Sequence, residues 1–318
     1  MSEYKKISFV IPCYRSEKTI RIVVDEIEQT MAQRSELQYE IILVNDGSPD
    51  NVWKVIADKA EEDEHIVGIN LAKNFGQHAA LMAGYNYCTG NLVVSLDDDG
   101  QTPADKVFLL IDELEKGYDV VYASYPEIHQ NAFRKWGADF AKKMSDYMFD
   151  IKDDRRGSSY FVTRRFVINE IIKYNHSYPY INGLLLRTTR NVSVVAIEHR
   201  ERIEGSSGYN LKSLISLWLN GFTAFSVKPL ELGAYTGFGM AMLGFLYAVY
   251  TIIRRLFTPT VVEGWSSLIS ITLIVGGIIM VMLGLIGEYI GRIYICINNS
   301  PQFVIKEITT QSERKEKN

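Results

Sequence analysis

The chain has 318 residues, of which 47% are hydrophobic, and its formal net charge is -4. This length allows one sizeable domain and a further segment, and the acidic balance argues against non-specific binding to nucleic acid, which needs a basic surface. The three cysteines are far apart and lack metal-ligand spacing, so we expect buried thiols in a reducing compartment.

The first two-thirds of the chain alternates short β-rich runs with stretches of helical period. This alternation predicts βαβ units and a mostly parallel sheet. The N-terminal apolar run is too short, and too soon broken by Pro12, for a secretory signal, so we expect this domain to stay in the cytosol. The predicted strands are Ile7–Cys13, Tyr39–Val44, Ile66–Leu71, Leu92–Leu96 and Asp119–Ala123.

Two of the predicted strands end in acidic residues. The second strand runs into Asn45-Asp-Gly-Ser, and the fourth runs into Asp97-Asp-Asp-Gly-Gln. Ligands of open α/β sheets bind beside the carboxyl ends of strands, so a site is expected there. Carboxylates two residues apart, with a carbonyl oxygen nearby at Gln101, are hard oxygen ligands that suit Mg²⁺ or Mn²⁺. The alternative is an acidic turn that only faces solvent.

From residue 125 to about residue 209 the pattern loosens into an α+β region that contains several basic pairs. This region ends in Gly205-Ser-Ser-Gly-Tyr, which is short, polar and rich in glycine, so we expect a mobile loop. The next stretch, 211–228, is amphipathic. Its place before two long apolar runs favours an interfacial helix over an ordinary surface helix.

The two apolar runs contain no charged residue. Leu232–Ile253 is 22 residues long and Gly264–Gly287 is 24. At about 1.5 Å per residue, each can cross a hydrocarbon core of about 30 Å. We therefore expect transmembrane helices at about 232–253 and 265–287, with a soluble helical hairpin as the alternative.

The flanks of these runs predict the topology of the membrane segment. We assign the two helices and their turn to 229–290, followed by a cytoplasmic tail at 291–318 that we expect to be charged and frayed after Pro301. Lysines and arginines at the inner ends favour a first domain on the cytoplasmic side of the membrane. Arg254 and Arg255 in the outer turn weaken that charge asymmetry.

One activity uses the acids at the strand ends, the basic residues near the loop and the hairpin together. A metal held by Asp99 and Gln101 would neutralise a diphosphate leaving group, and the membrane would supply a lipid acceptor. The donor would be a nucleotide sugar. A lipid phosphate, whose second pKa is about 6, is already a charged nucleophile at pH 7. Such a reaction needs no dedicated general base, and its phosphate needs arginine contacts instead.

Seven short pieces of the chain, together with the two-helix anchor, occur in the order in which a known family has them. On these pieces the chain resembles the inverting family 2 glycosyltransferases of GT-A fold. The similarity is to the polyprenyl-phosphate branch, which includes dolichol-phosphate mannosyltransferases and undecaprenyl-phosphate sugar transferases. The pieces are Phe9–Tyr14, Val44–Ser48, Asn74–Gln77, Asp97–Gln101, Gly117–Val121, Arg202–Tyr209 and Gly287–Tyr294.

The resemblance implies an α/β fold: a Rossmann-like GT-A catalytic domain with a mostly parallel sheet at 1–210, joined to the C-terminal two-helix transmembrane hairpin. It also implies a homo-oligomer that binds a nucleotide sugar, a polyprenyl phosphate and the lipid bilayer, and no nucleic acid. The cofactor would be Mg²⁺ or Mn²⁺. The segments around Asn74 and His199 look most similar to the aminoarabinose transferases.

The resemblance implies roles for particular residues as well. It places Asp97, Asp99 and Arg202 in catalysis, and Asp99, Gln101 and Asp97 around the metal. The residues expected at the nucleotide sugar are Pro12, Tyr14, Asp46, Asp97 and Asp98. The residues expected at the acceptor phosphate are Arg134, Arg200, Arg202, Ser207 and Tyr209.

Several positions depart from the family pattern or stay open. Arg15 replaces the usual asparagine, and Gly208 replaces a lysine of the mobile loop. Asp98 replaces a small residue and either touches the ribose or faces solvent. His78 is either a helix residue that packs locally or a contact of the donor.

These observations predict metal-dependent, inverting transfer of one sugar from a UDP-sugar to undecaprenyl phosphate, for a glycan or lipid of the cell envelope. A processive polysaccharide synthase is a near alternative, but its usual Gln-x-x-Arg-Trp motif is not matched at Gln130–Trp136. An aspartate-nucleophile phosphatase is a further alternative, which Gln101 disfavours. A membrane scaffold or lipid-translocation partner without catalysis is the alternative from another class.

Overall fold

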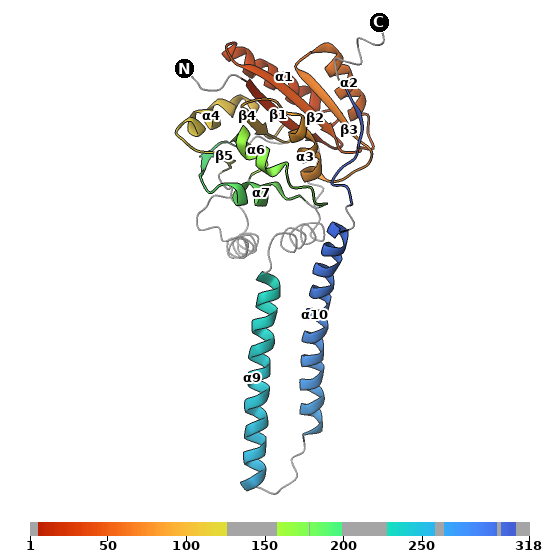
Figure 1. Cartoon of the computed structure of the whole chain (residues 1–318), viewed down its shortest axis with the longest axis vertical. Coiled ribbons are helices and arrows are strands. Elements are labelled where there is room, and N and C mark those ends of the chain that lie inside the picture. Colours follow the sequence, from red (N-terminus) through yellow and green to blue (C-terminus); the bar gives the residue numbers. More distant parts are fainter. Residues whose placement is uncertain are drawn as a thin grey trace. The chain divides into compact units, whose positions relative to one another are not determined.

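The computed structural model describes residues 6–125, 158–177, 179–198, 228–257, 264–297 and 300–309. The chain forms two compact units. The first comprises Met1–Tyr209 and Asn299–Asn318, and the second comprises Asn210–Asn298. The helical unit is thus inserted, in sequence, between the main part of the first unit and the segment that completes it (Figure 1).

An eight-stranded sheet forms the centre of the first unit as far as it is described. The strands are β1 (Lys6–Cys13), β2 (Gln38–Asn45), β3 (Ile66–Leu71), β4 (Leu92–Ser95), β5 (Val120–Ser124), β6 (Phe161–Arg164), β7 (Val192–Ala196) and β8 (Ile305–Ile308). Their order in the sheet is β7-β5-β6-β4-β1-β2-β3-β8. Only β6 and β8, among these strands, run antiparallel to their neighbours, which confirms the mostly parallel α/β sheet.

Helices cover both faces of this sheet. On one face, α1, α2 and α4 share a core with the strands, and on the other face α3 packs on β1 and β2 while α6 packs on β4 and β6. Helix α7 packs on α6. The helices are α1 (Ile20–Met31), α2 (Val52–Glu62), α3 (Gln77–Tyr87), α4 (Val107–Glu115), α6 (Arg165–Ile171) and α7 (Ile181–Thr188), with short 3-10 turns η1 (Ala32–Arg34) and η2 (Ala104–Lys106).

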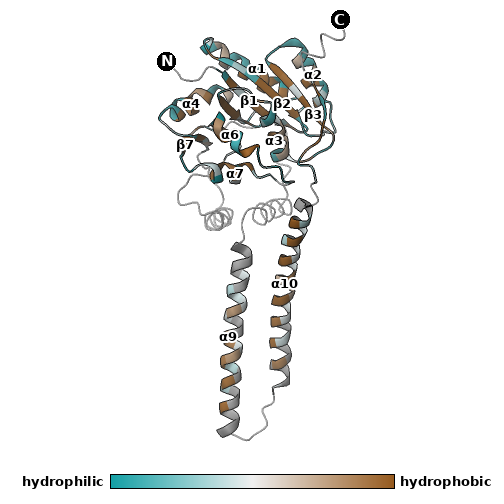
Figure 2. Ribbon diagram, in the orientation of Figure 1, coloured by the Kyte–Doolittle hydropathy of each residue, from teal (hydrophilic) through white to brown (hydrophobic). Residues whose placement is uncertain are grey.

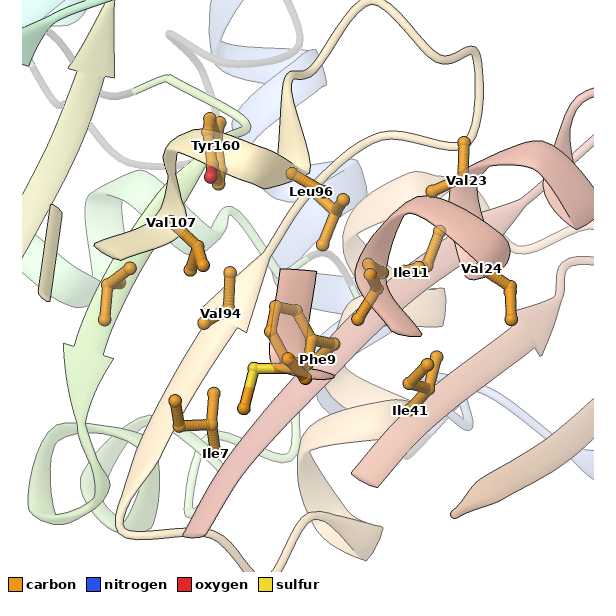
Figure 3. Close-up of a cluster of buried hydrophobic side chains, with 14 of the residues drawn as sticks. Ile7, Phe9, Ile11, Val23, Val24, Ile41, Val94, Leu96, Val107 and Tyr160 are labelled. Carbon is orange, nitrogen blue, oxygen red and sulfur yellow. The ribbon is translucent and has the colours of Figure 1, made fainter. Parts of the chain in front are cut away.

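The core under α1 shows why the first strand forms. Ile7, Phe9 and Ile11 alternate along β1 and point to the same face, where Val23 and Val24 of α1 meet them (Figure 3). All five side chains are at most 2% exposed. Burying a side chain of this size stabilises the fold by about 1.5–3 kcal/mol, so this alternation fixes which face of the strand lies under the helix.

The five strands predicted from the sequence form, each within one residue of its predicted ends. The prediction of a frayed tail is wrong for residues 302–309, where the structure describes an ordered segment. Strand β8 pairs antiparallel with β3, and the Ala72 N–H donates to the Val304 carbonyl oxygen (2.8 Å). The backbone groups along the edge of β3 thereby find partners in the tail.

The second unit contains two long helices, α9 (Lys228–Phe257) and α10 (Trp265–Ile297), at the positions of the two predicted runs. Figure 2 shows apolar residues along both helices. Large apolar side chains are exposed on each, for example Phe238 and Val281 at 72%. By length and hydropathy, none of the helices in the described ranges qualifies as a membrane span. The crossing of a membrane therefore stays a prediction, and the interfacial helix at 211–228 lies almost wholly outside the described residues.

Candidate active site

Four loops meet at the carboxyl-terminal edge of the sheet, because β1, β2, β3 and β4 run in the same direction. Hydrogen bonds join these loops directly. The Tyr14 N–H donates to Asp98 Oδ2 (2.9 Å), and Thr19 Oγ1 donates to the Asp98 carbonyl oxygen (2.6 Å). The Arg15 N–H donates to Ser48 Oγ (2.8 Å). The loops after β1, β2 and β4 thus form one connected edge.

Asp46 anchors the loop that follows β3. Its carboxylate accepts the Phe75 N–H at Oδ1 (2.7 Å) and the Gly76 N–H at Oδ2 (2.9 Å). Asn74 Nδ2 also donates to the Asp46 carbonyl oxygen (3.2 Å). Burial raises the pKa of Asp46 and the two amide hydrogen bonds oppose that rise. The side chain is 3% exposed, so in this structure its carboxylate shapes the loop.

Gly47 allows this loop to lie against the end of β2. Its φ of +56° is in the left-handed region, and a Cβ there would lie 2.3 Å from the carbonyl carbon of Lys73. Only glycine combines that backbone conformation with such a close approach of another backbone. The sequence Asn45-Asp-Gly-Ser therefore brings the loop after β3 onto Asp46.

Asp97 joins two segments that are far apart in the sequence. Gln77 Nε2 donates to its Oδ1 (2.9 Å), and Ser159 Oγ donates to its Oδ2 (2.5 Å). Gln77 begins α3, and Ser159 stands just before β6. The carboxylate therefore holds the start of a helix and the approach to an antiparallel strand beside the acidic run.

Asp98 faces the loop after β1. Besides the Tyr14 N–H, its surroundings include the carboxylates of Asp97 and Asp99. Burial and these two carboxylates raise the pKa of Asp98 to about 6. This geometry gives Asp98 a position in the fold that the sequence left open: it fixes the turn at Tyr14 and Arg15.

Asp99 and Gln101 belong to a tight turn. The Gln101 N–H donates to Asp99 Oδ1 (3.0 Å), and Gly100 between them has a φ of +73°. Two carboxylates and an amide oxygen at Asp97, Asp99 and Gln101 are the hard oxygen ligands that Mg²⁺ and Mn²⁺ take, so the side chains present fit such a metal. No cluster of three or more His, Cys, Asp or Glu that could hold a metal occurs in the described ranges. Phosphate oxygens of a donor would complete the coordination, as is usual for Mg²⁺.

The loop after β1 presents an aromatic side chain to solvent. Tyr14 is 43% exposed, and the Arg15 guanidinium lies 5.5 Å from the centre of its ring. Arg15 has a φ of +59°, which is uncommon for a residue other than glycine. Pro12 is buried at the end of β1. Tyr14 is thus the exposed member of the predicted nucleotide-binding set at this loop.

His78 packs against an aromatic ring beside the site. Its imidazole meets the Tyr180 ring edge-on, with centroids 5.3 Å apart. In the described part of the chain, its buried Nδ1 atom has no hydrogen-bond partner. Burial lowers the pKa of His78 to about 4, so the imidazole is neutral at pH 7. His78 is thus a helix residue whose ring packs against a neighbouring aromatic ring.

The structure brings together part of the predicted site. Tyr14, Asp46 and the run from Asp97 to Gln101 lie in connected loops at one edge, and Pro12 lies at the end of β1 beside them. The residues expected at the acceptor phosphate lie outside the described residues, so their roles stay predictions. They are Arg134, Arg200, Arg202, Ser207 and Tyr209.

Three polar side chains at this edge were not assigned a role from the sequence. Gln77 and Ser159 donate hydrogen bonds to Asp97, and Ser48 Oγ accepts a hydrogen bond from the Arg15 N–H. Gln77 and Ser48 lie in two of the seven motif pieces, which was the available signal. Ser159 stands two residues before β6, and only the pairing of β6 with β4 in the folded chain brings it to Asp97.

The family models and the similar proteins that match this chain all describe glycosyltransferases or a C-terminal hairpin. Residues 8–175 match the model of glycosyl transferase family 2, and residues 228–293 match that of the GtrB C-terminal hairpin. The undecaprenyl-phosphate 4-deoxy-4-formamido-L-arabinose transferase of Proteus mirabilis is 34% identical over 310 residues, covering 95% of this chain and 94% of that protein. An uncharacterized glycosyltransferase of Bacillus subtilis, YkcC, is 33% identical over 308 residues, covering 96% and 95% respectively.

The fold also has a solved counterpart. A crystal structure of glucosyl-3-phosphoglycerate synthase from Mycobacterium tuberculosis, in complex with Mn²⁺, UDP-glucose and phosphoglyceric acid, superimposes with a TM-score of 0.51. The match covers 68% of this chain and 76% of that one at 18% identity. At that identity the likeness establishes the shared GT-A architecture.

Proposed function

Because this chain belongs to glycosyl transferase family 2 and carries a GtrB C-terminal hairpin, we propose that it transfers one sugar from a UDP-sugar to undecaprenyl phosphate. The observation that carries the proposal is the acidic run from Asp97 to Gln101 at the sheet edge, hydrogen-bonded to the loop after β1 and to the start of α3. The full-length similarity to undecaprenyl-phosphate sugar transferases supports the acceptor, and the solved relative with Mn²⁺ and UDP-glucose supports the donor and the metal.

The proposed reaction is a single displacement. An oxygen of the lipid phosphate attacks the anomeric carbon of the sugar, and the bond from that carbon to the diphosphate breaks, which inverts the configuration. A phosphate that is already ionised at pH 7 needs no proton removed, so neither Asp97 nor Asp99 has to act as a base. When bound, Mg²⁺ or Mn²⁺ would offset the negative charge of the leaving diphosphate.

The side chains of the described loops have separate tasks in this proposal. Asp99 and Gln101, with Asp97, would hold the metal. Tyr14, exposed on the loop that Asp98 fixes, would contact the nucleotide. Asp46 would act through the backbone it holds, since the loop from Asn74 to Gly76 borders the same edge. Arg134 and Arg202 are proposed for the lipid phosphate.

The hairpin supports a membrane location for the reaction. Exposed apolar side chains along α9 and α10 are what a lipid-facing surface requires, and a polyprenyl acceptor is itself confined to a bilayer. We propose that the hairpin inserts into the inner membrane and that the first unit works on its cytoplasmic side. Extraction of membranes with alkaline carbonate tests insertion, since an inserted hairpin stays in the pellet and a peripheral one is released.

The experiment for the activity uses the full chain in membranes, with undecaprenyl phosphate, a panel of nucleotide sugars, and Mg²⁺ or Mn²⁺. Mass spectrometry of the extracted lipid should find a glycosyl phosphate with one donor. Asp99→Asn should lower the rate at least about a hundredfold, on the scale at which loss of a charge-stabilising group acts. The control Asp112→Asn changes an exposed acid of α4 and should leave the rate unchanged. No glycolipid from any donor would refute the proposed function.

A further inference from the structure

The segment Ser300–Thr309, here the return segment, follows α10 and belongs to the first unit. It contacts two loops of that unit besides pairing with β3. Among its residues, Gln302 is 9% exposed, although the segment is otherwise largely on the surface. A buried amide side chain in a terminal segment needs an explanation, because burying a polar group is costly unless it is hydrogen-bonded.

Gln302 finds its partners in the loop between α6 and α7. Its Nε2 donates to the carbonyl oxygens of His176 (2.8 Å) and Tyr174 (3.1 Å). Ser177 Oγ donates to the Ser300 carbonyl oxygen (2.7 Å) in the same place. Both N–H donors of the Gln302 amide are thus used to hold this loop to the return segment.

Two residues further on, the return segment reaches the loop after β3. The Val304 carbonyl oxygen accepts the Ala72 N–H (2.8 Å), one residue beyond the end of β3. Ala72 begins the stretch whose Phe75 and Gly76 amides bind the Asp46 carboxylate. Val304 therefore fixes the first residue of the loop that Asp46 fixes at its far end.

The two loops held by the return segment also lead to a shared contact. The loop after β3 runs into His78 of α3, and the loop after α6 runs into Tyr180, whose ring meets the His78 ring. The return segment at one end and the His78–Tyr180 contact at the other join the same two loops. Pairing with β3 alone would cover the sheet edge, and it needs none of the contacts that Gln302 makes.

We propose that Gln302 is a positioning residue for the donor site: by joining the loop at residues 174–177 to the return segment, it keeps the loop at residues 72–76 in the conformation that binds the nucleotide sugar. The proposal rests on the proposed function for the identity of the donor. The effect of Gln302 on the order of the loop at residues 72–76 is independent of the proposed function, because it can be measured without any ligand.

The first measurement is hydrogen exchange of the full chain without ligand. Gln302→Met keeps the length of the side chain and removes both donated hydrogen bonds. Exchange at Phe75 and Gly76 should become about three- to tenfold faster, the range that loss of one or two net hydrogen bonds produces. The matched control is Thr309→Val, which removes the hydrogen bond from the Gly68 N–H (2.7 Å) at the other end of the same segment. It should leave exchange at these two amides unchanged.

A milder variant guards against misfolding of Gln302→Met. Ser177→Ala removes only the hydrogen bond to the Ser300 carbonyl oxygen and should speed exchange at Phe75 and Gly76 to a smaller degree. A purely structural role for the segment predicts the opposite pattern. In that case Gln302→Met and Thr309→Val would lower the melting temperature alike and leave exchange at the loop at the wild-type rate, which would overturn the proposal.

The second measurement is calorimetric binding of UDP in the presence of Mn²⁺. Gln302→Met should weaken UDP binding about three- to tenfold, with kcat at saturating donor within about twofold of the wild type, because the loop is ordered by the bound nucleotide. Thr309→Val should bind UDP as the wild type does. If the wild type itself fails to bind UDP, the proposed donor is wrong. The exchange measurement still tests whether Gln302 orders the loop at residues 72–76.

Discussion

At the scale of single residues, the acidic run contains three carboxylates with different surroundings. Asp97 is held by side chains from α3 and from the approach to β6, Asp98 by a backbone amide of the loop after β1, and Asp99 by the amide of Gln101. The position of the run at the strand end could be predicted from the sequence. The partners could not, because Gln77 and Ser159 lie 20 and 62 residues from Asp97.

Asp98 offers a test of this division of roles. Asp98→Asn keeps an oxygen that can accept the Tyr14 N–H, so the free energy of unfolding should stay within about 1 kcal/mol of the wild type. Asp98→Ala leaves that N–H without this acceptor and should lower the free energy of unfolding by about 1–3 kcal/mol, measured by urea denaturation. Mn²⁺ binding should survive in Asp98→Asn and be lost in Asp99→Asn. Equal loss of Mn²⁺ binding in both would show that Asp98 is itself a ligand.

The surroundings of Glu40 in β2 make the stability of the fold depend on pH. Its carboxylate accepts Ser8 Oγ–H (2.5 Å) and the Thr89 N–H (2.5 Å), and Lys6 Nζ lies 2.7 Å away. Burial by itself would raise the pKa of Glu40, but these hydrogen bonds outweigh burial, and the pKa lies below its usual value of 4.5.

Because the pKa of Glu40 is lowered in the folded state, its contribution to the free energy of unfolding decreases at acidic pH. Because the unfolded chain binds the proton of Glu40 more readily, its contribution to stability is complete above about pH 4.5 and is lost as pH falls through the lower pKa of the folded state. Glu40→Gln should remove that part of the pH dependence in thermal melts between about pH 3 and 5. At pH 7 it should cost about 1–3 kcal/mol, since the amide NH₂ that replaces Oε2 cannot accept from Lys6 Nζ or from Thr89 Oγ1. An unchanged acid limb in Glu40→Gln would contradict this account.

At the scale of elements, the sequence predicts a strand well where a long apolar run is bounded by turn residues. Strands β1 to β4 have that pattern, and their side chains are buried on both faces. Strand β8 lacks this pattern, since Lys306 and Glu307 at its centre are exposed. It forms because its backbone groups hydrogen-bond with those along the edge of β3. A four-residue strand with two charged residues at its centre lacks the apolar run from which the other strands are predicted.

Gly84 lies in α3 where the helix packs closely on the sheet, and this packing decides whether Gly84→Ala raises or lowers the free energy of unfolding. Gly84→Ala would ordinarily stabilise a helix by about 1 kcal/mol. Here the new Cβ would lie 2.4 Å from Val10 Cγ1 and 3.2 Å from Val44 Cγ2. The helix would have to move off the sheet, so the free energy of unfolding should fall by about 1–3 kcal/mol in urea denaturation.

The double variant separates packing from helix propensity. Val10→Ala removes the atom that the new Cβ meets, so Gly84→Ala should cost at least about 1 kcal/mol less in that background. Asn86→Ala, on the exposed side of α3, is the control and should change stability little in either background. Additive effects of Gly84→Ala and Val10→Ala would mean that the helix already has room at this point.

At the scale of the whole molecule, the chain returns after its helical unit to complete the sheet of the first unit. Strand β3 pairs with β2 on one side and with β8 on the other, and the Thr309 N–H donates to the Gly68 carbonyl oxygen (2.9 Å) beyond the ladder. A chain that stops after residue 299 would therefore have β3 as an open edge. Open apolar edges pair with other chains and promote aggregation.

Two truncations measure what this return contributes. Ending the chain after residue 310 keeps every described contact of β8 and should leave the melting temperature in detergent unchanged. Ending it after residue 299 removes the ladder with β3 and the hydrogen bonds of Gln302, and should lower the free energy of unfolding by about 2 kcal/mol or more. Light scattering should show aggregation only in the shorter chain. If both chains melt together and stay monodisperse, the edge of β3 is protected by something other than β8, and the strand adds no stability to the fold.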